Sequence, residues 1–220
     1  GYASKTFHAP LIGGTPGMAL KAVASSDADK VHADWPGVKV MSAPGDLLDD
    51  PDIDLVVIAT PNDTHFPLAK AALEAGKHVV VDKPFTVTLS QARELESLAK
   101  HCGRILSVFH NRRWDSDFLT VSALINEGQL GEVCYFESHF DRFRPQVRQR
   151  WREQAGPGSG IWYDLAPHLL DQVVVLFGLP VSITVDLAQL RPGAQSTDYF
   201  HAVLAYPQRR VVLHGTLLAA

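Results

Sequence analysis

A run of three valines that ends abruptly in an acid, a lysine and a proline places the strongest constraint on how this chain folds. Residues 79–81 are the valines, and Asp82, Lys83 and Pro84 follow directly. A continuous β-branched run predicts a strand buried on both faces, as in a parallel sheet covered by helices. Ligands bind at the carboxyl ends of the strands in such sheets, so Lys83 is predicted to meet a substrate there. The alternative is a solvated lysine beside a turn proline.

Alternating strand and helix patterns continue through the first half of the chain. Strands are predicted at 18–24, 38–41, 53–59, 79–81 and 105–109, and helices at 5–12, 67–75 and 90–100. Strands that alternate with helices predict a parallel sheet with right-handed crossovers. Residues 1–110 are therefore expected to form a Rossmann-type, doubly wound α/β domain that binds a nucleotide.

The predicted first helix has no strand before it, although a doubly wound fold needs one to lead into the first turn. We therefore expect the chain to begin inside the domain, with the first strand missing. Gly1 is then expected to belong to the phosphate-binding loop, where the lack of a side chain lets the backbone approach a pyrophosphate at the helix N-terminus. The alternative is a terminal glycine without this role.

The pattern changes in residues 111–220. Helices are predicted at 118–127 and 165–177, and strands at 133–140, 183–190, 199–206 and 211–218. Consecutive strands without a helix between them predict an antiparallel meander. We expect an incomplete α+β substrate-binding domain with a mainly antiparallel sheet. A sheet that packs on helices with one face leaves the other open, so association into a homo-oligomer through this face is expected, and a large apolar outer face would mark it.

Composition excludes several classes of partner. The net charge is −4 over 220 residues and the basic residues are dispersed, which favours a small molecule over nucleic acid or an anionic membrane. No run approaches the roughly 18 apolar residues of a membrane span. Cys102 and Cys134 form no Cys-x-x-Cys pattern, which fits a reducing cytoplasm rather than a disulfide scaffold.

Asp164 and His168 lie four residues apart where a helix is predicted to start, with Pro167 in its first turn. This spacing places both side chains on one helix face, which Asp171 continues. The alternative makes Asp164 a helix N-cap and His168 a half-buried surface imidazole. We expect no metal site here, because two carboxylates and one histidine would need ligands from elsewhere and the other histidines are scattered.

Together these features predict a lysine, an acid and an imidazole around one cleft between two domains. In addition to these groups, hydride transfer requires only a nicotinamide cofactor and a positioned substrate. A nicotinamide carries out the redox chemistry, the protein positions the carbinol carbon, and an imidazole removes the hydroxyl proton.

The sequence resembles the family of NAD(P)-dependent oxidoreductases that includes glucose–fructose oxidoreductase, inositol dehydrogenase and the rhizopine-catabolism proteins (Gfo/Idh/MocA). Residues 82–84 are similar to the Glu-Lys-Pro strand end of this family, with Asp82 in place of Glu, and residues 164–168 to its Asp-x-x-x-His helix. Residues 110–115, 142–145 and 150–152 further resemble a bacterial branch that contains an NADP-dependent scyllo-inositol dehydrogenase.

The resemblance implies an enzyme that acts on CH–OH groups of a cyclic polyol or sugar. It implies that Lys83 binds and polarises the substrate oxygen, His168 is the acid/base and Asp164 orients a neighbouring hydroxyl. It also implies that Pro84 lies against the nicotinamide. The dinucleotide is expected to contact Gly1, Thr60, Pro61, Asn62, His65, Asp82, Lys83, Pro84, Asn111, Trp151 and Arg152. For the last two, the alternative is a packed aromatic ring and a salt bridge within the loop.

The end of the strand predicted at 18–24, which is the second strand of a complete Rossmann-type domain, indicates the cofactor. NAD enzymes usually place an acid there, whereas Ser25 and Ser26 come first here and Lys30 follows. Hydroxyls and a cation suit a 2′-phosphate, so Ser25, Ser26 and Lys30 favour NADP over NAD. Asp27 and Asp29 count against this, and two serines often only start a helix.

Two other interpretations remain open. One is a nucleotide- or sugar-binding regulator of the same fold without catalysis. The presence of Lys83, Asp164 and His168 together favours the enzyme, because a binder needs none of them. The other is that a chain lacking strands at both ends has unpaired edges and is itself inactive.

Overall fold

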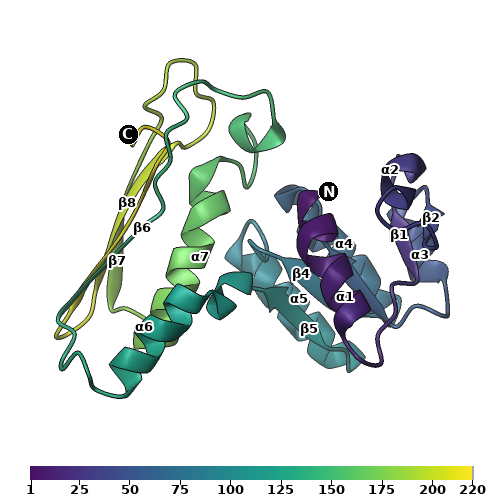
Figure 1. Cartoon of the computed structure of the whole chain (residues 1–220), viewed down its shortest axis with the longest axis horizontal. Helices are drawn as coiled ribbons and strands as arrows, with labels where there is room; N and C mark the ends of the chain where they lie inside the picture. The colour runs from purple at the N-terminus through teal and green to yellow at the C-terminus, as the bar shows by residue number, and fades with distance from the viewer. Residues whose placement is uncertain (220) are drawn as a thin grey trace. The chain divides into compact units, whose positions relative to one another are not determined.

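The computed structural model describes residues 1–219, which form two compact units. The first unit is Gly1–Phe109 and the second begins at His110. Figure 1 labels most of the helices and strands of each unit. Among the described residues no helix combines the length and apolarity required to cross a bilayer.

The core of the first unit is a parallel sheet of three strands in the order β3-β4-β5. Its strands are β3 (Leu55–Ile58), β4 (His78–Asp82) and β5 (Leu106–Phe109). Val79 and Val81 of β4 are fully buried, while Val80 is half-buried, so only one face of the strand is completely covered. The helices of the core are α4 (His65–Glu74), which follows the short helix η2 (Asn62–Thr64), and α5 (Leu89–Cys102). Leu73 of α4 and Leu95 of α5 are fully buried in the same cluster, so the helices hold β4 in place.

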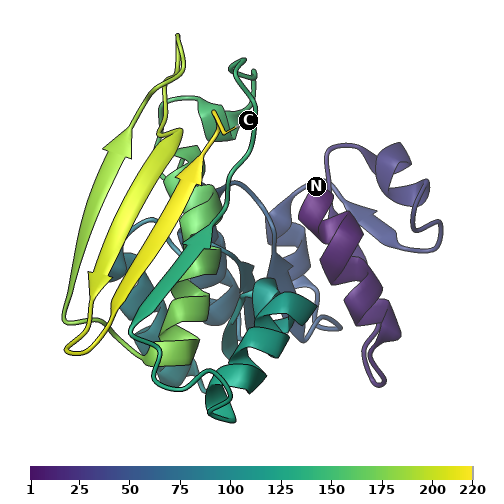
Figure 2. The same cartoon turned by 60° about the vertical axis from the view of Figure 1, so that its left-hand side comes forward.

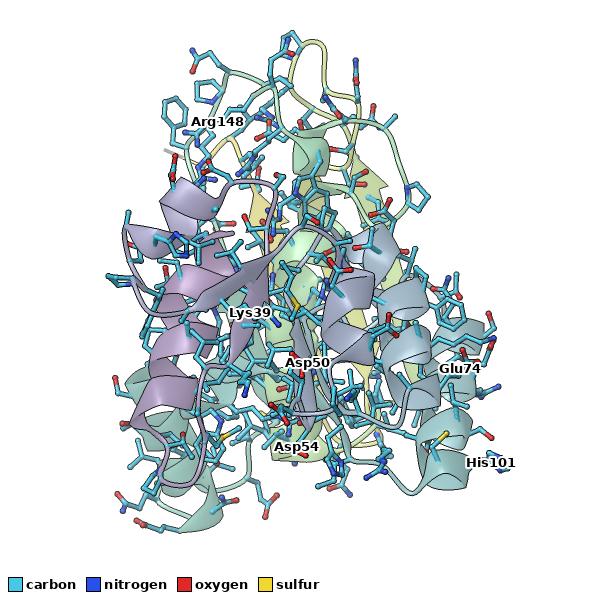
Figure 3. All side chains as sticks on the ribbon, turned by 90° about the vertical axis from the view of Figure 1, so that its right-hand side faces the viewer. Lys39, Asp50, Asp54, Glu74, His101 and Arg148 are labelled. Carbon is cyan, nitrogen blue, oxygen red and sulfur yellow. The ribbon has the colours of Figure 1, made fainter. Side chains whose placement is uncertain are left out.

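A separate pair of parallel strands, β1 (Ala22–Ala24) and β2 (Lys39–Met41), completes the sheet structure of this unit. The remaining helices are η1 (Ser4–His8), α1 (Ala9–Gly14), α2 (Ala28–His32) and α3 (Pro44–Asp49). Asp50 connects the two sheets: its carboxylate lies 3.4 Å from the Lys39 ammonium, and its carbonyl accepts a 2.7 Å hydrogen bond from Lys77. Figure 3 labels Lys39 and Asp50, which lie close together.

The second unit packs one long helix against a sheet of four strands in the order β6-β9-β8-β7. The strands are β6 (Tyr135–His139), β7 (Ser182–Ala188), β8 (Tyr199–Ala205) and β9 (Arg210–Thr216). The helices are η3 (Asn111–Trp114), α6 (Ser116–Asn126), η4 (Trp151–Glu153) and α7 (Gly160–Phe177). Leu165, Leu169 and Val173 of α7 are buried against Phe200 and Leu213 of the sheet, and no described helix covers the other face (Figure 2).

The predicted fold class is confirmed: a parallel Rossmann-type sheet is followed by an α/β unit with a mixed sheet. The second sheet is mainly antiparallel, as expected, but β6 pairs with β9 in parallel. A parallel contact at this edge was not visible in the sequence, because β6 is separated from β9 by a long loop and α7.

The predicted start of α7 is wrong. The helix begins at Gly160 with Ser159 as its N-cap, so Asp164 is inside the helix and is not an N-cap. Pro167 is therefore in the helix interior, not in the first turn, and cannot donate a hydrogen bond to the carbonyl four residues earlier. A glycine-rich segment was taken for a loop, whereas the backbone N–H of Ile161 donates to the Thr197 carbonyl at 2.8 Å and fixes the helix start.

Gly160 generates a stability prediction. Its φ is +83°, and a Cβ at this position would lie 2.8 Å from the Thr197 nitrogen and 2.9 Å from its carbonyl oxygen. We expect Gly160→Ala to lower the free energy of unfolding by about 1–3 kcal/mol or more, because the backbone strain and the clash with Thr197 add to each other. Urea denaturation measures this. Gly156→Ala is the control, since its Cβ would meet nothing within 4 Å; equal stabilities for the two variants would contradict the expectation.

Candidate functional site

Loops from two neighbouring strands meet at the carboxyl edge of the three-stranded sheet. Thr60, Pro61 and Asn62 follow β3, and Lys83 and Pro84 follow β4. Thr60 and Pro61 are exposed, while Asn62 and Pro84 are buried. Since parallel strands end on the same side of a sheet, both loops face the region where a ligand of this fold binds.

Gly1 belongs to the same edge. A Cβ placed on Gly1 would lie 3.9 Å from the carbonyl oxygen of Ala59, the residue after β3. The Gly1 carbonyl also accepts a hydrogen bond from the Lys5 backbone at 3.1 Å, so Gly1 leads directly into the first helix. The predicted neighbours of a pyrophosphate therefore include a glycine at a helix start, exposed residues after β3 and the loop after β4.

His65 connects the two loops. Its side chain is only 1% exposed, with Nδ1 2.8 Å from the carbonyl oxygen of Pro84 and Nε2 3.0 Å from that of Thr60. The imidazole therefore sets the separation between the loop after β3 and the loop after β4. Direct contact of His65 with a dinucleotide stays a prediction; what the structure provides is a support beneath both loops.

A histidine that the sequence analysis missed lies beside the strand-end acid. His8 is 6% exposed, and its Nε2 is 3.8 Å from Asp82 Oδ2. Asp82 Oδ1 accepts a 2.8 Å hydrogen bond from the Lys83 backbone N–H. Burial raises the pKa of Asp82, but His8 and the Lys83 N–H together outweigh this and hold the pKa below its usual value. Asp82 therefore stays ionised, and its carboxylate fixes the backbone from which Lys83 projects. No local pattern marked His8, because its contact with Asp82 depends on how the first helix packs.

The three residues predicted to read the cofactor ribose follow β1. The Ser25 hydroxyl donates to the Asp27 carbonyl at 3.1 Å and accepts from the Asp27 N–H, so it is used within the turn. Asp27, not a serine, caps α2 by accepting a 3.0 Å hydrogen bond from the Lys30 N–H. The side chains of Ser26 and Lys30 are exposed and accessible to a ligand.

Helix α7 presents the acid and imidazole of the second unit on one face. His168 is 7% exposed, so it is buried and not half-buried, and its ring lies 6.2 Å from that of Phe140. Asp164 Oδ1 lies 3.4 Å from the Arg152 Nε, and the Arg152 guanidinium stacks 4.3 Å above the Trp151 ring. Arg152 thus forms a salt bridge with α7 and not within the loop, and contact of Trp151 and Arg152 with a dinucleotide stays a prediction.

The segment before α7 is held by a buried ion cluster that the sequence did not reveal. Arg191 is 4% exposed; its guanidinium lies 3.0 Å from Asp198 and 3.0 Å from Glu153, and it donates to the Arg144 carbonyl at 3.0 Å. Burial raises the pKa of Glu153, but hydrogen bonds from the Arg148 backbone, Arg150 and Arg191 outweigh it, so the pKa is lowered. This cluster fixes η4 and hence the position of Arg152. Figure 3 labels Arg148 on this loop.

Two cations lie around Phe140: Arg112 of η3, and Arg142 in the segment after β6. Asn111 is half-buried in η3. The backbone carbonyl of the next residue, Arg112, accepts a 3.1 Å hydrogen bond from the Gln172 side chain of α7. The guanidinium groups of Arg112 and Arg142 lie 4.8 Å and 5.1 Å from the centre of the Phe140 ring. The buried His168 ring therefore contacts the same Phe140 ring as these two guanidinium groups, of which Arg112 is paired with Asp115 at 2.7 Å.

A Rossmann-type unit with a lysine at its ligand-binding edge, followed by a unit with an Asp/His helix, defines the class of two-domain nicotinamide-binding oxidoreductases. Residues 1–110 match the model of the oxidoreductase family with an NAD-binding Rossmann fold, and residues 122–219 match that of its C-terminal alpha/beta domain. The chain belongs to the Gfo/Idh/MocA oxidoreductase family.

Individual relatives agree with this assignment. The chain is 80% identical over 220 residues to the oxidoreductase YdgJ of Escherichia coli, covering 100% of this chain and 64% of the relative. It is 38% identical over 215 residues to the NADP-dependent scyllo-inositol 2-dehydrogenase IolW of Bacillus subtilis, covering 98% and 60%. An oxidoreductase structure from Yersinia pestis superposes with a TM-score of 0.93 at 71% identity, covering 100% of this chain and 62% of that one. The chain thus spans under two thirds of the length of these relatives.

Proposed function

We propose that the protein is an NAD(P)-dependent oxidoreductase that transfers a hydride between the nicotinamide and a hydroxyl-bearing carbon of a cyclic polyol or sugar. The observation that carries this proposal is Lys83, which follows a strand paired on both sides and lies at the edge where ligands of this fold bind. The Asp164/His168 face of α7 supports it, and the likeness to a scyllo-inositol dehydrogenase supports an inositol-like substrate.

Each residue has a distinct role in the proposed reaction. His168 removes the proton from the hydroxyl that is oxidised, and the Lys83 ammonium stabilises the developing negative charge on that oxygen. Asp164, held by Arg152, orients a neighbouring hydroxyl. The nicotinamide, when bound, supplies the hydride chemistry. Gly1, Thr60, Pro61 and the loop after β4 fit such a cofactor, because exposed groups and a helix start share one sheet edge.

Substitution of the proposed acid/base and the lysine tests the catalytic assignment. We expect His168→Ala and Lys83→Ala each to lower kcat about 10²–10⁴-fold at saturating cofactor, because a proton acceptor or a charge donor is lost. Steady-state assays with a panel of inositols and aldoses measure this. His101→Ala and Lys100→Ala are matched controls, since both residues are exposed in the last turn of α5. Near-normal kcat in both test variants would contradict these catalytic roles, whereas a wild-type protein that binds cofactor and polyol without turnover would support the binding regulator.

We further propose that NADP is preferred over NAD, with the exposed side chains of Ser26, before α2, and Lys30, within α2, binding the 2′-phosphate. A hydrogen bond to a charged group contributes about 1.5–3 kcal/mol. Lys30→Ala is therefore expected to lower kcat/KM for NADP about 10- to 150-fold and to leave the value for NAD nearly unchanged. Lys21→Ala, at an exposed lysine just before β1, is the control. A parent protein that prefers NAD, or equal losses for both cofactors, would count against the proposal.

Association through the sheet of the second unit is our proposal for the quaternary structure. No described helix covers the outer face of this sheet (Figure 2), where Val203 of β8 lies opposite Val212 of β9. Polar side chains cross the middle of this outer face, however: His139, His214, His201 and Asp186. The large apolar face that we expected is therefore not what would drive association. We expect light scattering at micromolar concentration to give a multiple of the chain mass and Val203→Glu, on the outer face, to reduce it. A wild-type protein that is only monomeric would refute this.

A further inference from the structure

A row of polar side chains crosses the outer face of the four-stranded sheet. The strand register places His139 of β6 opposite His214 of β9, His214 opposite His201 of β8, and His201 opposite Asp186 of β7. Side chains alternate along a strand, and the sequence neighbours Phe140, Val185, Phe200, Ala202 and Leu213 belong to the core against α7. The three imidazoles therefore lie on the face without helices, where Figure 2 shows the strands side by side.

His139, His214 and Asp141 converge on one point at the β6 end of this row. His139 Nδ1 is 3.2 Å from one carboxylate oxygen of Asp141, and His214 Nε2 is 3.6 Å from the other. One ligand atom from each residue lies within 4.8 Å of the other two. Ligands at zinc–ligand distances of about 2.0–2.2 Å in a tetrahedral site are about 3.3–3.6 Å apart, so small side-chain rotations suffice to close the site.

A second carboxylate already orients one of these imidazoles. Glu137 Oε1 lies 2.6 Å from His139 Nε2, which directs the opposite ring nitrogen, Nδ1, toward Asp141. Tyr135 donates a 2.8 Å hydrogen bond to the other oxygen of Glu137, and the Thr216 backbone N–H donates to Asp141 at 3.2 Å. Carboxylates that hold the far nitrogen of a histidine ligand are typical of metal sites, where they fix the ring and raise its basicity.

The donor set indicates which ion fits. Two imidazole nitrogens and one carboxylate suit zinc and its neighbours in the transition series, whereas calcium and magnesium prefer oxygen ligands alone. Three protein ligands leave a coordination position for water. In the single chain His139 and Asp141 are partly open to solvent, so an ion can reach them before two chains associate through this face.

We propose that His139, Asp141 and His214 bind one divalent transition-metal ion, zinc, on the outer face of the sheet, with Glu137 supporting His139. This site requires residues of the second unit only and does not depend on the proposed oxidoreductase activity. The sequence analysis expected no metal; the ligands are far apart in the chain, and only the β6–β9 pairing brings them together.

Calorimetric titration of the chelator-treated protein with zinc chloride tests the proposal. We expect one zinc ion per chain, a loss of about 10- to 100-fold in affinity for Glu137→Gln, and at least as large a loss for His214→Ala and Asp141→Asn. His201→Ala is the matched control, because its ring is 5.8 Å from that of His214 on the same face but is not one of the three ligands. Equal affinities for wild type and His214→Ala, or an equal loss in His201→Ala, would overturn the assignment.

A spectroscopic measurement on the wild-type protein avoids dependence on variants that fold poorly. Cobalt(II) added in place of zinc is expected to give intense visible absorption bands of a four-coordinate ion, and zinc is expected to remove them. Weak bands of a six-coordinate ion, or no change in the spectrum, would also overturn the proposal.

Discussion

The pairing of β4 on both of its edges is the constraint on which the first unit depends. β4 forms parallel ladders with β3 and β5, and its Val79 and Val81 are fully buried. A shift of one residue would move every side chain of β4 to the opposite face, so burial fixes the register. The position of Lys83 therefore follows from the core, and His65 beneath the adjacent loops restricts it further.

In the second unit, buried charged side chains rather than apolar packing fix the position of the candidate site residues. Arg191 is paired with Asp198 and Glu153, and an uncompensated charge at such a depth costs about 3–5 kcal/mol. The loop before α7 is therefore held in one conformation, which places Arg152 beside Asp164. The start of α7 at Gly160, which fits only without a side chain, belongs to the same arrangement. Core packing therefore fixes the position of Lys83, and the buried ion cluster fixes the arginine that pairs with Asp164.

What could be predicted from the sequence depended on how local the signal was. The strand before Lys83 and the i, i+4 spacing of Asp164 and His168 are local patterns, and the fold class followed from them. The start of α7 was placed too late, because a glycine-rich segment resembles a loop until its contact with Thr197 is known. The contact between His8 and Asp82, the Arg191 cluster and the histidine row depend on register and packing, which no local pattern encodes.

Transfer of deuterium from substrate to nicotinamide tests the proposed hydride transfer most directly. The protein is incubated with NADP and an inositol deuterated on all of its ring carbons, and the nicotinamide product is analysed by mass spectrometry. If the protein transfers a hydride from the substrate carbon as proposed, each reduced cofactor carries one deuterium atom. Binding of the cofactor and the polyol without any transfer of label would contradict a catalytic role and indicate a protein that only binds them.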